Sequence, residues 1–377
     1  MIKTRLFTPG PTDVPPEVLV EMARPIFHHR TDRFKEMLGE VHDGVRKVLG
    51  TSGDILTLTG SGTSGMEAAI ACAVARDKKV LIANGGKFGE RWVKVAKRYH
   101  LDVDEVELAW GTALQPATVK DKLATGDYGA VIVVHSETST ATACDLEAIG
   151  KEVAATDALL IADCITSAGA LPVKTDAWGV DIVGIGSQKA MMLPPGLATL
   201  AVSQKAWKVI DDIEAPCFYL DLKAYRKSAG ANDTPYTPAV TLIRGMQVAL
   251  DMINAIGIDT VTARTAILAE AVRQAAEAIG MTVFSKQPSD SVTGLLYPDG
   301  IDDGFRKALQ EKYGASIAGG QNQLKGKLCR ISHMGYVDPL DTIGLIAAME
   351  YTLADLGAKV EVGAGVAVAT KVLCQWQ

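Results

Sequence analysis

A glycine-rich loop early in the chain has the composition of an anion-binding site. The apolar segment DILTLT runs into the loop GSGTSG at residues 60–65, and the helical pattern MEAAIACAVA follows directly. Glycines let the backbone approach an anion, and the free N–H groups at a helix N-terminus stabilise its negative charge. The sequence therefore predicts a phosphate-binding loop at 60–65.

The same six residues also fit the dinucleotide fingerprint G-x-G-x-x-G. That fingerprint requires an acidic residue about 20 positions on, at the end of the next strand, to bind a ribose. Here the next strand pattern, VLIAN, ends in Asn84 and is followed by two glycines. The dinucleotide interpretation therefore loses most of its support. A glycine-rich turn without a ligand remains the other alternative for the loop taken by itself.

An acidic residue and a lysine follow two later strand patterns. ALLIADC places Asp163 at the C-terminal end of one strand, and DIVGIGSQK places Lys189 just past the end of another. Ligands of open α/β sheets bind at the carboxyl ends of the strands. We therefore expect Asp163 and Lys189 to face one crevice.

This pair suits pyridoxal phosphate, whose aldehyde forms a Schiff base with a lysine amine and whose ring takes up electrons. Asp163 is the candidate that keeps the pyridine nitrogen protonated. The amine of Lys189, once released, could move a proton at the substrate's Cα. Taken singly, Asp163 could cap a helix and Lys189 could be a surface charge. The phosphate loop in the expected order favours the cofactor interpretation.

One arginine is a candidate anchor for a substrate carboxylate. Arg330 lies in KLCRISHMG, a strand pattern near the end of the chain. A guanidinium binds a carboxylate through two parallel hydrogen bonds, and an amino-acid substrate needs such an anchor. An arginine on the surface of a strand fits this segment equally well, because most arginines are exposed.

The elements that must position these residues form an α/β domain. Between residues 53 and 200, short apolar strands alternate with helical patterns, as in a largely parallel sheet covered by helices on both faces. After long helical patterns at 242–256 and 260–279 the order changes to strand, strand, helix, strand, strand, helix. We predict a large domain, with the N-terminal segment, at 1–255 and a smaller α+β domain at 256–377; the segment 360–377 receives no role.

The composition is that of an ordinary globular protein. The 377 residues are 48% hydrophobic and 22% charged, with a net charge of −6 and no run of like charges, which argues against nucleic-acid and membrane-surface proteins. The six cysteines are widely spaced and predict reduced thiols. No signal peptide or apolar span is apparent, so we expect a cytoplasmic protein.

Motifs along nearly the whole chain resemble one family. LFTPGPTDVPPEVL, TGSGTSGMEA, NGGKFGERW, VHSETSTA, ADCITSAGALP, GSQKAMMLPPG, TPYTPAV and KLCRISHMG occur in the order found in class V pyridoxal-phosphate aminotransferases of the alanine/serine-glyoxylate group. The resemblance implies the fold-type-I architecture and an obligate homodimer with shared active sites.

The resemblance also implies a role for individual residues. The phosphate would be bound by Ser61, Gly62 and Thr63, and by Thr237 of the neighbouring subunit. Phe88 would stack on the pyridine ring, Thr138 would contact its phenolic oxygen, Asp163 would pair with the pyridine nitrogen, and Gln188 would act beside the Schiff-base Lys189. Arg330 would anchor the substrate carboxylate, with the backbone of Gly10 nearby. No metal is implied.

Two positions depart from the family pattern. Relatives often carry tryptophan at the position of Phe88 and histidine at that of Thr63, so Phe88 could instead be a core residue. The segment His28-His29-Arg30 lines the entrance in some relatives, and an ordinary loop is the alternative.

Transamination is the leading functional hypothesis, from a small amino acid such as alanine or serine to a 2-oxo acid such as glyoxylate or pyruvate. The fold also hosts lyases and cysteine desulfurases. A desulfurase needs a nucleophilic cysteine on a mobile loop, whereas Cys329 lies in a strand and should point away from Arg330. A non-catalytic subunit that retains the fold is the third hypothesis. The residues leave the exact donor, the acceptor and larger oligomers open.

Overall fold

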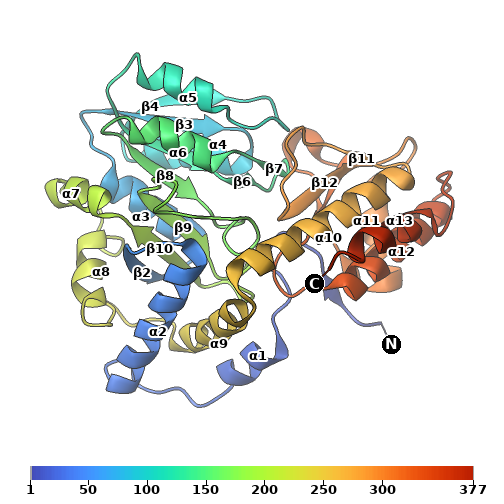
Figure 1. Cartoon of the computed structure of the whole chain (residues 1–377), viewed down its shortest axis with the longest axis horizontal. Helices are drawn as coiled ribbons and strands as arrows, with labels where there is room; N and C mark the ends of the chain where they lie inside the picture. The colour runs from blue at the N-terminus through green and yellow to red at the C-terminus, as the bar shows by residue number, and fades with distance from the viewer. Residues whose placement is uncertain (1, 377) are drawn as a thin grey trace.

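The computed structural model describes residues 2–376, and its main element is a seven-stranded sheet. The strand order is β2-β10-β9-β8-β5-β3-β4 (Figure 1). The strands are β2 (Asp54–Thr59), β3 (Lys79–Asn84), β4 (Asp102–Glu107), β5 (Tyr128–Val134), β8 (Leu159–Asp163), β9 (Ile182–Gly186) and β10 (Leu197–Val202). Most of these strands are continuous apolar runs, as expected for strands covered on both faces.

The sheet is parallel except at one strand. β10 pairs antiparallel with both β2 and β9, while β9, β8, β5, β3 and β4 run parallel to their neighbours. The carboxyl ends of β8 and β9 therefore meet at the same edge of the sheet, as the alternating pattern predicted. Asp163 ends β8, and the segment after β9 carries Lys189 to that edge.

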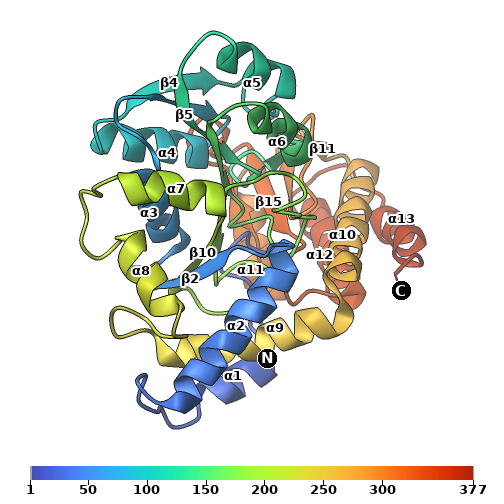
Figure 2. The same ribbon diagram turned by 60° about the vertical axis from the view of Figure 1, so that its left-hand side comes forward.

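Helices cover both faces of this sheet and enclose two apolar cores (Figures 1 and 2). One face packs against α2 (Asp32–Leu49), α5 (Pro116–Leu123), α6 (Leu146–Ala154) and α9 (Val240–Ile256). The other face packs against α3 (Gly62–Ala73), α4 (Lys87–Arg98), α7 (Gln204–Asp212) and α8 (Leu222–Ala229). Because side chains alternate along a strand, Asp163 lies on the same face as Leu159 and Ile161, which pack in the second core.

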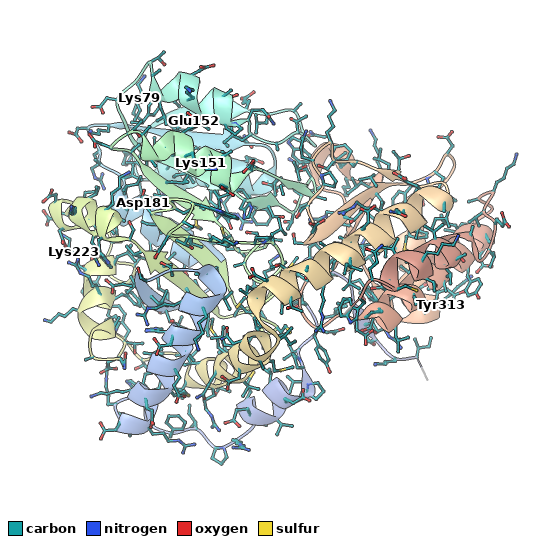
Figure 3. All side chains as sticks on the ribbon, in the orientation of Figure 1. Lys79, Lys151, Glu152, Asp181, Lys223 and Tyr313 are labelled. Carbon is teal, nitrogen blue, oxygen red and sulfur yellow. The ribbon has the colours of Figure 1, made fainter. Side chains whose placement is uncertain are left out.

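A buried carboxylate holds β8, β9 and β10 in register. Asp181, just before β9, accepts hydrogen bonds from the backbone N–H of Leu160 at 2.9 Å and from the hydroxyl of Ser203 at 2.9 Å. Figure 3 labels it inside the large domain, whereas the labelled Lys151 and Glu152 lie on the outer helix α6. Since a buried carboxylate must be paired or hydrogen-bonded, these bonds stabilise the strand that leads to Lys189.

The C-terminal part surrounds a four-stranded antiparallel sheet with the order β11-β12-β15-β14. Its strands are β11 (Thr282–Val283), β12 (Val292–Leu296), β14 (Ala318–Gly319) and β15 (Leu328–Ser332). A third apolar core packs this sheet against α10 (Ile258–Ala278), α11 (Gly304–Tyr313), α12 (Pro339–Asp355) and α13 (Ala364–Leu373). The fold is thus the fold-type-I architecture predicted from the sequence: a mainly parallel α/β domain with a smaller α+β domain.

The N-terminal segment joins the smaller domain. β1 (Arg5–Leu6) pairs in parallel with β13 (Ala315–Ser316), and Phe7 belongs to the third core. The chain then enters the large domain through α1 (Pro16–Met22). We keep 255/256 as the proposed domain boundary because α9 ends at Ile256 and α10 begins at Ile258.

The C-terminal segment, which the sequence left without a role, contains a packed helix. α13 packs against α10 and α12, and the carboxylate of Glu350 accepts the backbone N–H groups of Gly363, Gly365 and Val366 at 2.6–3.0 Å. These N–H groups at the start of a helix lack intrahelical partners, so Glu350 caps α13 from α12. Within residues 2–376, no helix has the length and apolar character needed to cross a bilayer.

Candidate functional site

Lys189 lies at the carboxyl edge of the sheet and is almost fully buried. Its side chain is 8% exposed, and its amine donates a hydrogen bond to the backbone carbonyl of Pro9. Burial lowers the pKa of the amine to about 8, although Asp163 nearby raises it; Arg330 and Arg91 lower it further. A buried lysine with a lowered pKa is partly neutral near neutral pH, which is the form that attacks a carbonyl.

Gly10 packs directly against this lysine. A Cβ on Gly10 would lie 2.5 Å from Nζ and 2.7 Å from Cε of Lys189, and the backbone φ of +122° favours glycine. The next turn is fixed to the same segment, since Thr12 donates its hydroxyl to the Lys189 carbonyl at 2.9 Å and its N–H to the Gln188 carbonyl at 3.2 Å. The structure thus brings Gly10 to Lys189, although 179 positions of the printed sequence separate them.

Asp163 is held at the end of β8 by two donors. Its Oδ1 accepts the N–H of Ile165 at 3.0 Å, and its Oδ2 accepts the indole N–H of Trp92 at 2.9 Å. Burial raises the pKa of Asp163 to about 6, the two donors lower it, Glu137 raises it and Lys189 lowers it. Each of Asp163 and Lys189 also shifts the pKa of the other, which agrees with their position at one edge of the sheet.

The glycine-rich segment leads into α3, but the helix begins at Gly62, four residues earlier than the sequence predicted, so residues 62–65 form its first turn. Ser61 is the N-cap residue, its hydroxyl makes no capping bond, and Gly62 begins the helix. A Cβ on Gly62 would lie 2.6 Å from Cδ1 of Ile165, so the helix start packs tightly against the residue two beyond Asp163. The positive end of the helix and the uncapped N–H groups form an anion-binding surface.

Gln188 places an unpaired oxygen at this surface. Its Oε1 is buried without a hydrogen-bond partner in the protein and lies 3.2 Å from the Cβ position of Gly186. The same Cβ position is 3.7 Å from Cα of Gly62. A buried polar atom without a partner is costly unless something bonds it, and its place beside the loop marks a position where a ligand could supply that partner.

Phe88 is positioned by a carboxylate that the sequence interpretation overlooked. Glu137, 5% exposed, accepts the backbone N–H groups of Phe88 at 2.9 Å, Gly89 at 3.1 Å and Ser139 at 3.1 Å. It also accepts the Ser139 hydroxyl. Because two backbone N–H groups of the first turn of α4 and one of the following loop residue Ser139 converge on one carboxylate, Glu137 fixes the start of α4 to the loop that carries Thr138. The motif HSETST contained this residue, but its spacing did not reveal the role.

Arg91 connects Phe88 with the glycine-rich loop. Its Nη1 donates to the hydroxyl of Thr63 at 3.1 Å, and its guanidinium carbon lies 4.6 Å from the centre of the Phe88 ring. The sequence interpretation also missed this cation. It brings positive charge to the start of α3, where the sequence predicts a phosphate.

The small domain contributes Arg330 from β15. The side chain is 7% exposed and donates from Nε to the Gly319 carbonyl at 2.9 Å and from Nη1 to the Thr138 carbonyl at 3.0 Å. The alternative of a surface arginine is therefore wrong. Cys329, its neighbour, is buried on the opposite side of the strand in the third core, as alternation predicted, and burial raises the pKa of its thiol to about 12.

Thr237 is exposed and lies in a segment that follows the edge of the large domain. Nearby, the N–H of Ala239 bonds the hydroxyl of Thr59 at 3.0 Å, which places the segment beside the strand leading into the glycine-rich loop. Arg30 pairs with Asp233 at 2.5 Å and donates to the Thr234 carbonyl at 2.7 Å. The loop at 28–30 therefore contacts the segment that leads to Thr237.

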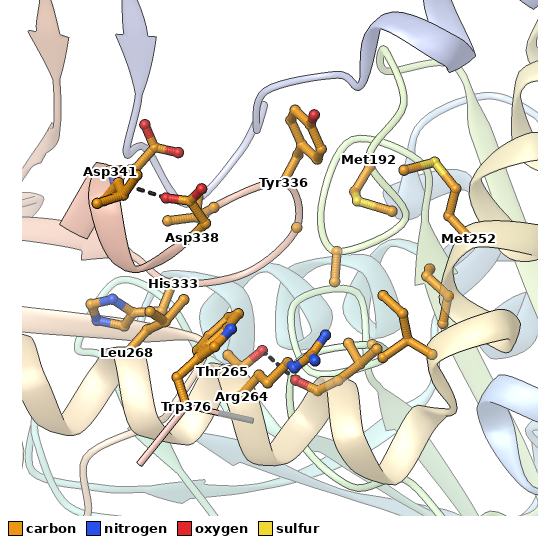
Figure 4. Close-up of a pocket in the computed structure, with 18 of the residues that line it drawn as sticks. Met192, Met252, Arg264, Thr265, Leu268, His333, Tyr336, Asp338, Asp341 and Trp376 are labelled. Carbon is orange, nitrogen blue, oxygen red and sulfur yellow. Dashed lines mark hydrogen bonds between the residues drawn. The ribbon is translucent and has the colours of Figure 1, made fainter. Parts of the chain in front are cut away.

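A cavity of about 550 Å³ lies beside the segment that follows Lys189 (Figure 4). Its lining includes Met192, Met252, Tyr336 and Trp376, and Arg264 lies over the Trp376 ring, 5.2 Å from its centre. Within residues 2–376, its lining includes none of the residues predicted to bind phosphate, ring or carboxylate. The predicted site residues around Lys189 therefore lie outside the lining of this cavity.

Residues 5–339 match the aminotransferase class-V family. The chain is 41% identical to an uncharacterized aminotransferase of Methanocaldococcus jannaschii over 99% of this chain and 98% of that protein. It is 38% identical to a soluble hydrogenase small subunit of Synechococcus sp., with 98% of each chain covered. It is 36% identical to a serine–glyoxylate aminotransferase of Methylorubrum extorquens over 98% of this chain and 96% of that enzyme.

Solved structures show the same architecture over the whole chain. Pyridoxamine-pyruvate aminotransferase of Mesorhizobium loti superposes with a TM-score of 0.94 at 30% identity, and ureidoglycine-glyoxylate aminotransferase of Bacillus subtilis with a TM-score of 0.94 at 27% identity. Each comparison covers 99% of this chain and 98% of the other. These likenesses agree with the position of Lys189, Asp163 and the glycine-rich segment at one edge of the sheet. The chain belongs to the class-V aminotransferases, a pyridoxal-phosphate-dependent family.

Proposed function

We propose that this protein is a transaminase that moves the amino group of a small amino acid, such as alanine or serine, to a 2-oxo acid such as glyoxylate or pyruvate by a ping-pong reaction. The observation that carries the proposal is the buried amine of Lys189, whose pKa is lowered to about 8 beside the carboxylate of Asp163. A neutral amine and an ionisable carboxylate at one sheet edge suit an enzyme that transfers nitrogen and a proton.

The residues present fit pyridoxal phosphate. The uncapped start of α3 with Ser61, Gly62 and Thr63 would hold the phosphate, and Gln188, whose Oε1 has no partner in the protein, would act beside Lys189. Asp163 would meet the pyridine nitrogen, while Phe88 and Thr138 would contact the ring and its phenolic oxygen. When bound, the cofactor supplies the aldehyde that accepts the amino group and the ring that takes up electrons.

The protein side chains would then orient the substrate and move the proton. Arg330 would bind the substrate carboxylate, and its fixed bonds to Gly319 and Thr138 limit its freedom before substrate arrives. Lys189, released as a neutral amine, would take a proton from the Cα of the amino donor. In the second half of the reaction it would return a proton to the Cα of the 2-oxo acid. Burial of Lys189 and Asp163 keeps water from competing for that proton.

The names of the relatives favour 2-oxo acid acceptors of this size. Serine–glyoxylate, ureidoglycine-glyoxylate and pyridoxamine-pyruvate aminotransferases all carry glyoxylate or pyruvate in their names. An L-aspartate–glyoxylate aminotransferase of Paracoccus denitrificans, 36% identical, widens the range of donors to be tested. We therefore expect glyoxylate or pyruvate to accept the amino group from several different donors.

We also propose a homodimer in which Thr237 binds the phosphate in the partner's site. Exposed apolar side chains gather around the Thr237 segment: Phe218 is 82% exposed and Tyr219 is 42% exposed, and both rings contact Tyr236. Ile26 is 69% exposed on the adjoining loop. Exposed apolar side chains of this size are typical of a protein–protein interface.

The runner-up activities receive less support. A desulfurase requires a reactive thiolate, but Cys329 is buried with a pKa raised to about 12. The likeness to a soluble hydrogenase small subunit keeps a non-catalytic role as an alternative. A protein that only binds a partner has no use for a buried lysine, a buried aspartate and a buried arginine around one site.

The deciding experiment is absorption spectroscopy of the purified protein with added pyridoxal phosphate. We expect a visible band from the linkage to Lys189 that bleaches with alanine or serine and returns with glyoxylate or pyruvate. Lys189→Ala should lack the band and the activity. A stable band that no amino acid changes would refute the proposed transamination but not cofactor binding. Absence of any band in the wild-type protein would refute the proposed function as a whole.

A further inference from the structure

We propose that Trp92 is a positioning residue for Asp163: its indole N–H holds the carboxylate in the orientation in which it can meet the cofactor's pyridine nitrogen. The proposal rests on the proposed function, because it assigns to Asp163 the pairing with that nitrogen. Trp92 lies on α4 in the core that covers the Asp163 face of the sheet, and it is fully buried. Its Nε1 lies 2.9 Å from Oδ2 of Asp163.

Two donors of different origin determine the plane of this carboxylate. The backbone N–H of Ile165 bonds Oδ1 at 3.0 Å, and the indole bonds Oδ2. Both donors can bond only to an acceptor, so both favour the ionised carboxylate over the protonated acid. Each oxygen retains a second lone-pair direction, which leaves room for the N–H of a protonated pyridine.

A buried tryptophan in this core does not need such a partner. Trp207 on α7 packs in the same core and is 2% exposed, yet its Nε1 has no hydrogen-bond partner in the protein. Apolar packing alone therefore accounts for a large ring in this layer, but not for the direction of the Trp92 N–H. The contact with Asp163 is a specific feature of position 92.

The charges that face Asp163 make the indole donor important. Glu137 opposes ionisation of Asp163, Lys189 favours it, and burial opposes it most strongly. These influences hold the pKa of Asp163 at about 6, near enough to neutral pH that loss of one donor changes the ionised fraction. Without the indole, a larger share of Asp163 would be protonated and would lack the negative charge that pairs with a pyridinium.

The test compares Trp92→Phe with Trp207→Phe. Both changes remove a buried indole from the same core, but only the first removes a bonded N–H. We expect Trp92→Phe to raise the pKa of the Asp163 carboxyl in the cofactor-free protein, measured by carbon NMR titration. We also expect it to weaken equilibrium binding of pyridoxal phosphate about tenfold near neutral pH, the effect of losing one hydrogen bond to a charged group. Trp207→Phe should change neither quantity.

A second variant separates hydrogen bonding from packing. Replacement of Trp92 by benzothienylalanine retains the two fused rings and puts sulfur in place of the N–H, so it should reproduce both effects even if Trp92→Phe folds poorly. Unchanged Asp163 titration and cofactor affinity in this variant would overturn the positioning role while leaving the proposed function intact. A wild-type protein that binds no pyridoxal phosphate would instead refute the proposed function, and the NMR titration would still decide the Trp92–Asp163 interaction.

Discussion

Arg330 of the small domain donates a hydrogen bond from Nη1 to the backbone carbonyl of Thr138 in the large domain at 3.0 Å. The proposed anchor for the substrate carboxylate is thus oriented by the loop that is proposed to contact the cofactor. The carboxylate of Glu137, one residue earlier, fixes that loop to the start of α4. Substrate anchor and cofactor loop are therefore coupled through adjacent residues of one segment.

Arg330→Lys should raise the KM for the amino donor by about 10- to 100-fold, because a lysine retains the charge but loses the two-pronged hydrogen bond, worth roughly 1.5–3 kcal/mol. Steady-state kinetics with alanine and with serine measure the change. Arg306→Lys is the matched control, since Arg306 belongs to the same domain but pairs with Asp303. An equal KM in both variants would contradict the assignment of Arg330.

Gly10→Ala should abolish covalent capture of pyridoxal phosphate, because the added Cβ would lie 2.5 Å from Nζ of Lys189. The absorption band of the Lys189–cofactor linkage measures capture. Gly300→Ala is the control: Gly300 has a φ of +82°, and an added Cβ would have nothing within 4 Å. Both variants carry a strained backbone. A loss of cofactor capture in Gly10→Ala alone would therefore come from the contact with Lys189. Normal capture by Gly10→Ala would show that the lysine moves away freely.

Glu137→Gln should lower the free energy of unfolding by roughly 2–4 kcal/mol, since an amide replaces a buried carboxylate that accepts three backbone N–H groups. It should also weaken cofactor binding, because Phe88 and Thr138 lose their common support. Glu350→Gln provides the comparison: Glu350 likewise accepts three backbone N–H groups, but at the start of α13. Chemical denaturation should show a similar loss in the free energy of unfolding for both variants. Titration with pyridoxal phosphate should show weaker binding only for Glu137→Gln.

Capture of pyridoxal phosphate by the cofactor-free protein should accelerate with pH. The neutral amine of Lys189 is the reactive form, and its pKa is lowered to about 8, so the rate should rise through about pH 8 and level off above it. Stopped-flow absorption over a pH series measures this profile. A rate that still rises steeply near the ordinary lysine pKa would show that the site does not lower the pKa of this amine.

Mixed dimers test the proposed sharing of active sites. One subunit carries Lys189→Ala and the other Thr237→Glu, whose negative charge should repel the phosphate in whichever site Thr237 serves. If Thr237 serves the partner's site, the mixed dimer keeps one intact site and about half of the wild-type activity, while both parent homodimers are inactive. If Thr237 serves its own subunit's site, the mixed dimer is inactive as well. Activity after co-expression with two affinity tags distinguishes the outcomes.

The sequence by itself determined six of the seven strands of the central sheet, the glycine-rich segment before α3 and the residues at the carboxyl edge. These features depend on local order: apolar runs form covered strands, and Asp163 and Lys189 follow directly from them. The strand β4 was missed because DVDEVE is an edge strand that pairs only with β3 and carries polar side chains. The pattern of apolar runs also did not reveal that β10 is antiparallel to both neighbours, since strand direction depends on the path of the connecting chain.

Only the tertiary structure decided which distant residues complete the site. Gly10 meets Lys189, Trp92 bonds Asp163, and Glu137 collects the N–H groups of Phe88 and Gly89 through contacts between segments far apart in the chain. Such contacts follow from how α4, the N-terminal segment and the strand ends pack around one core, and no local spacing encodes them. The sequence reveals the types and the order of the reactive residues, but burial and long-range hydrogen bonds set their orientation and their pKa values.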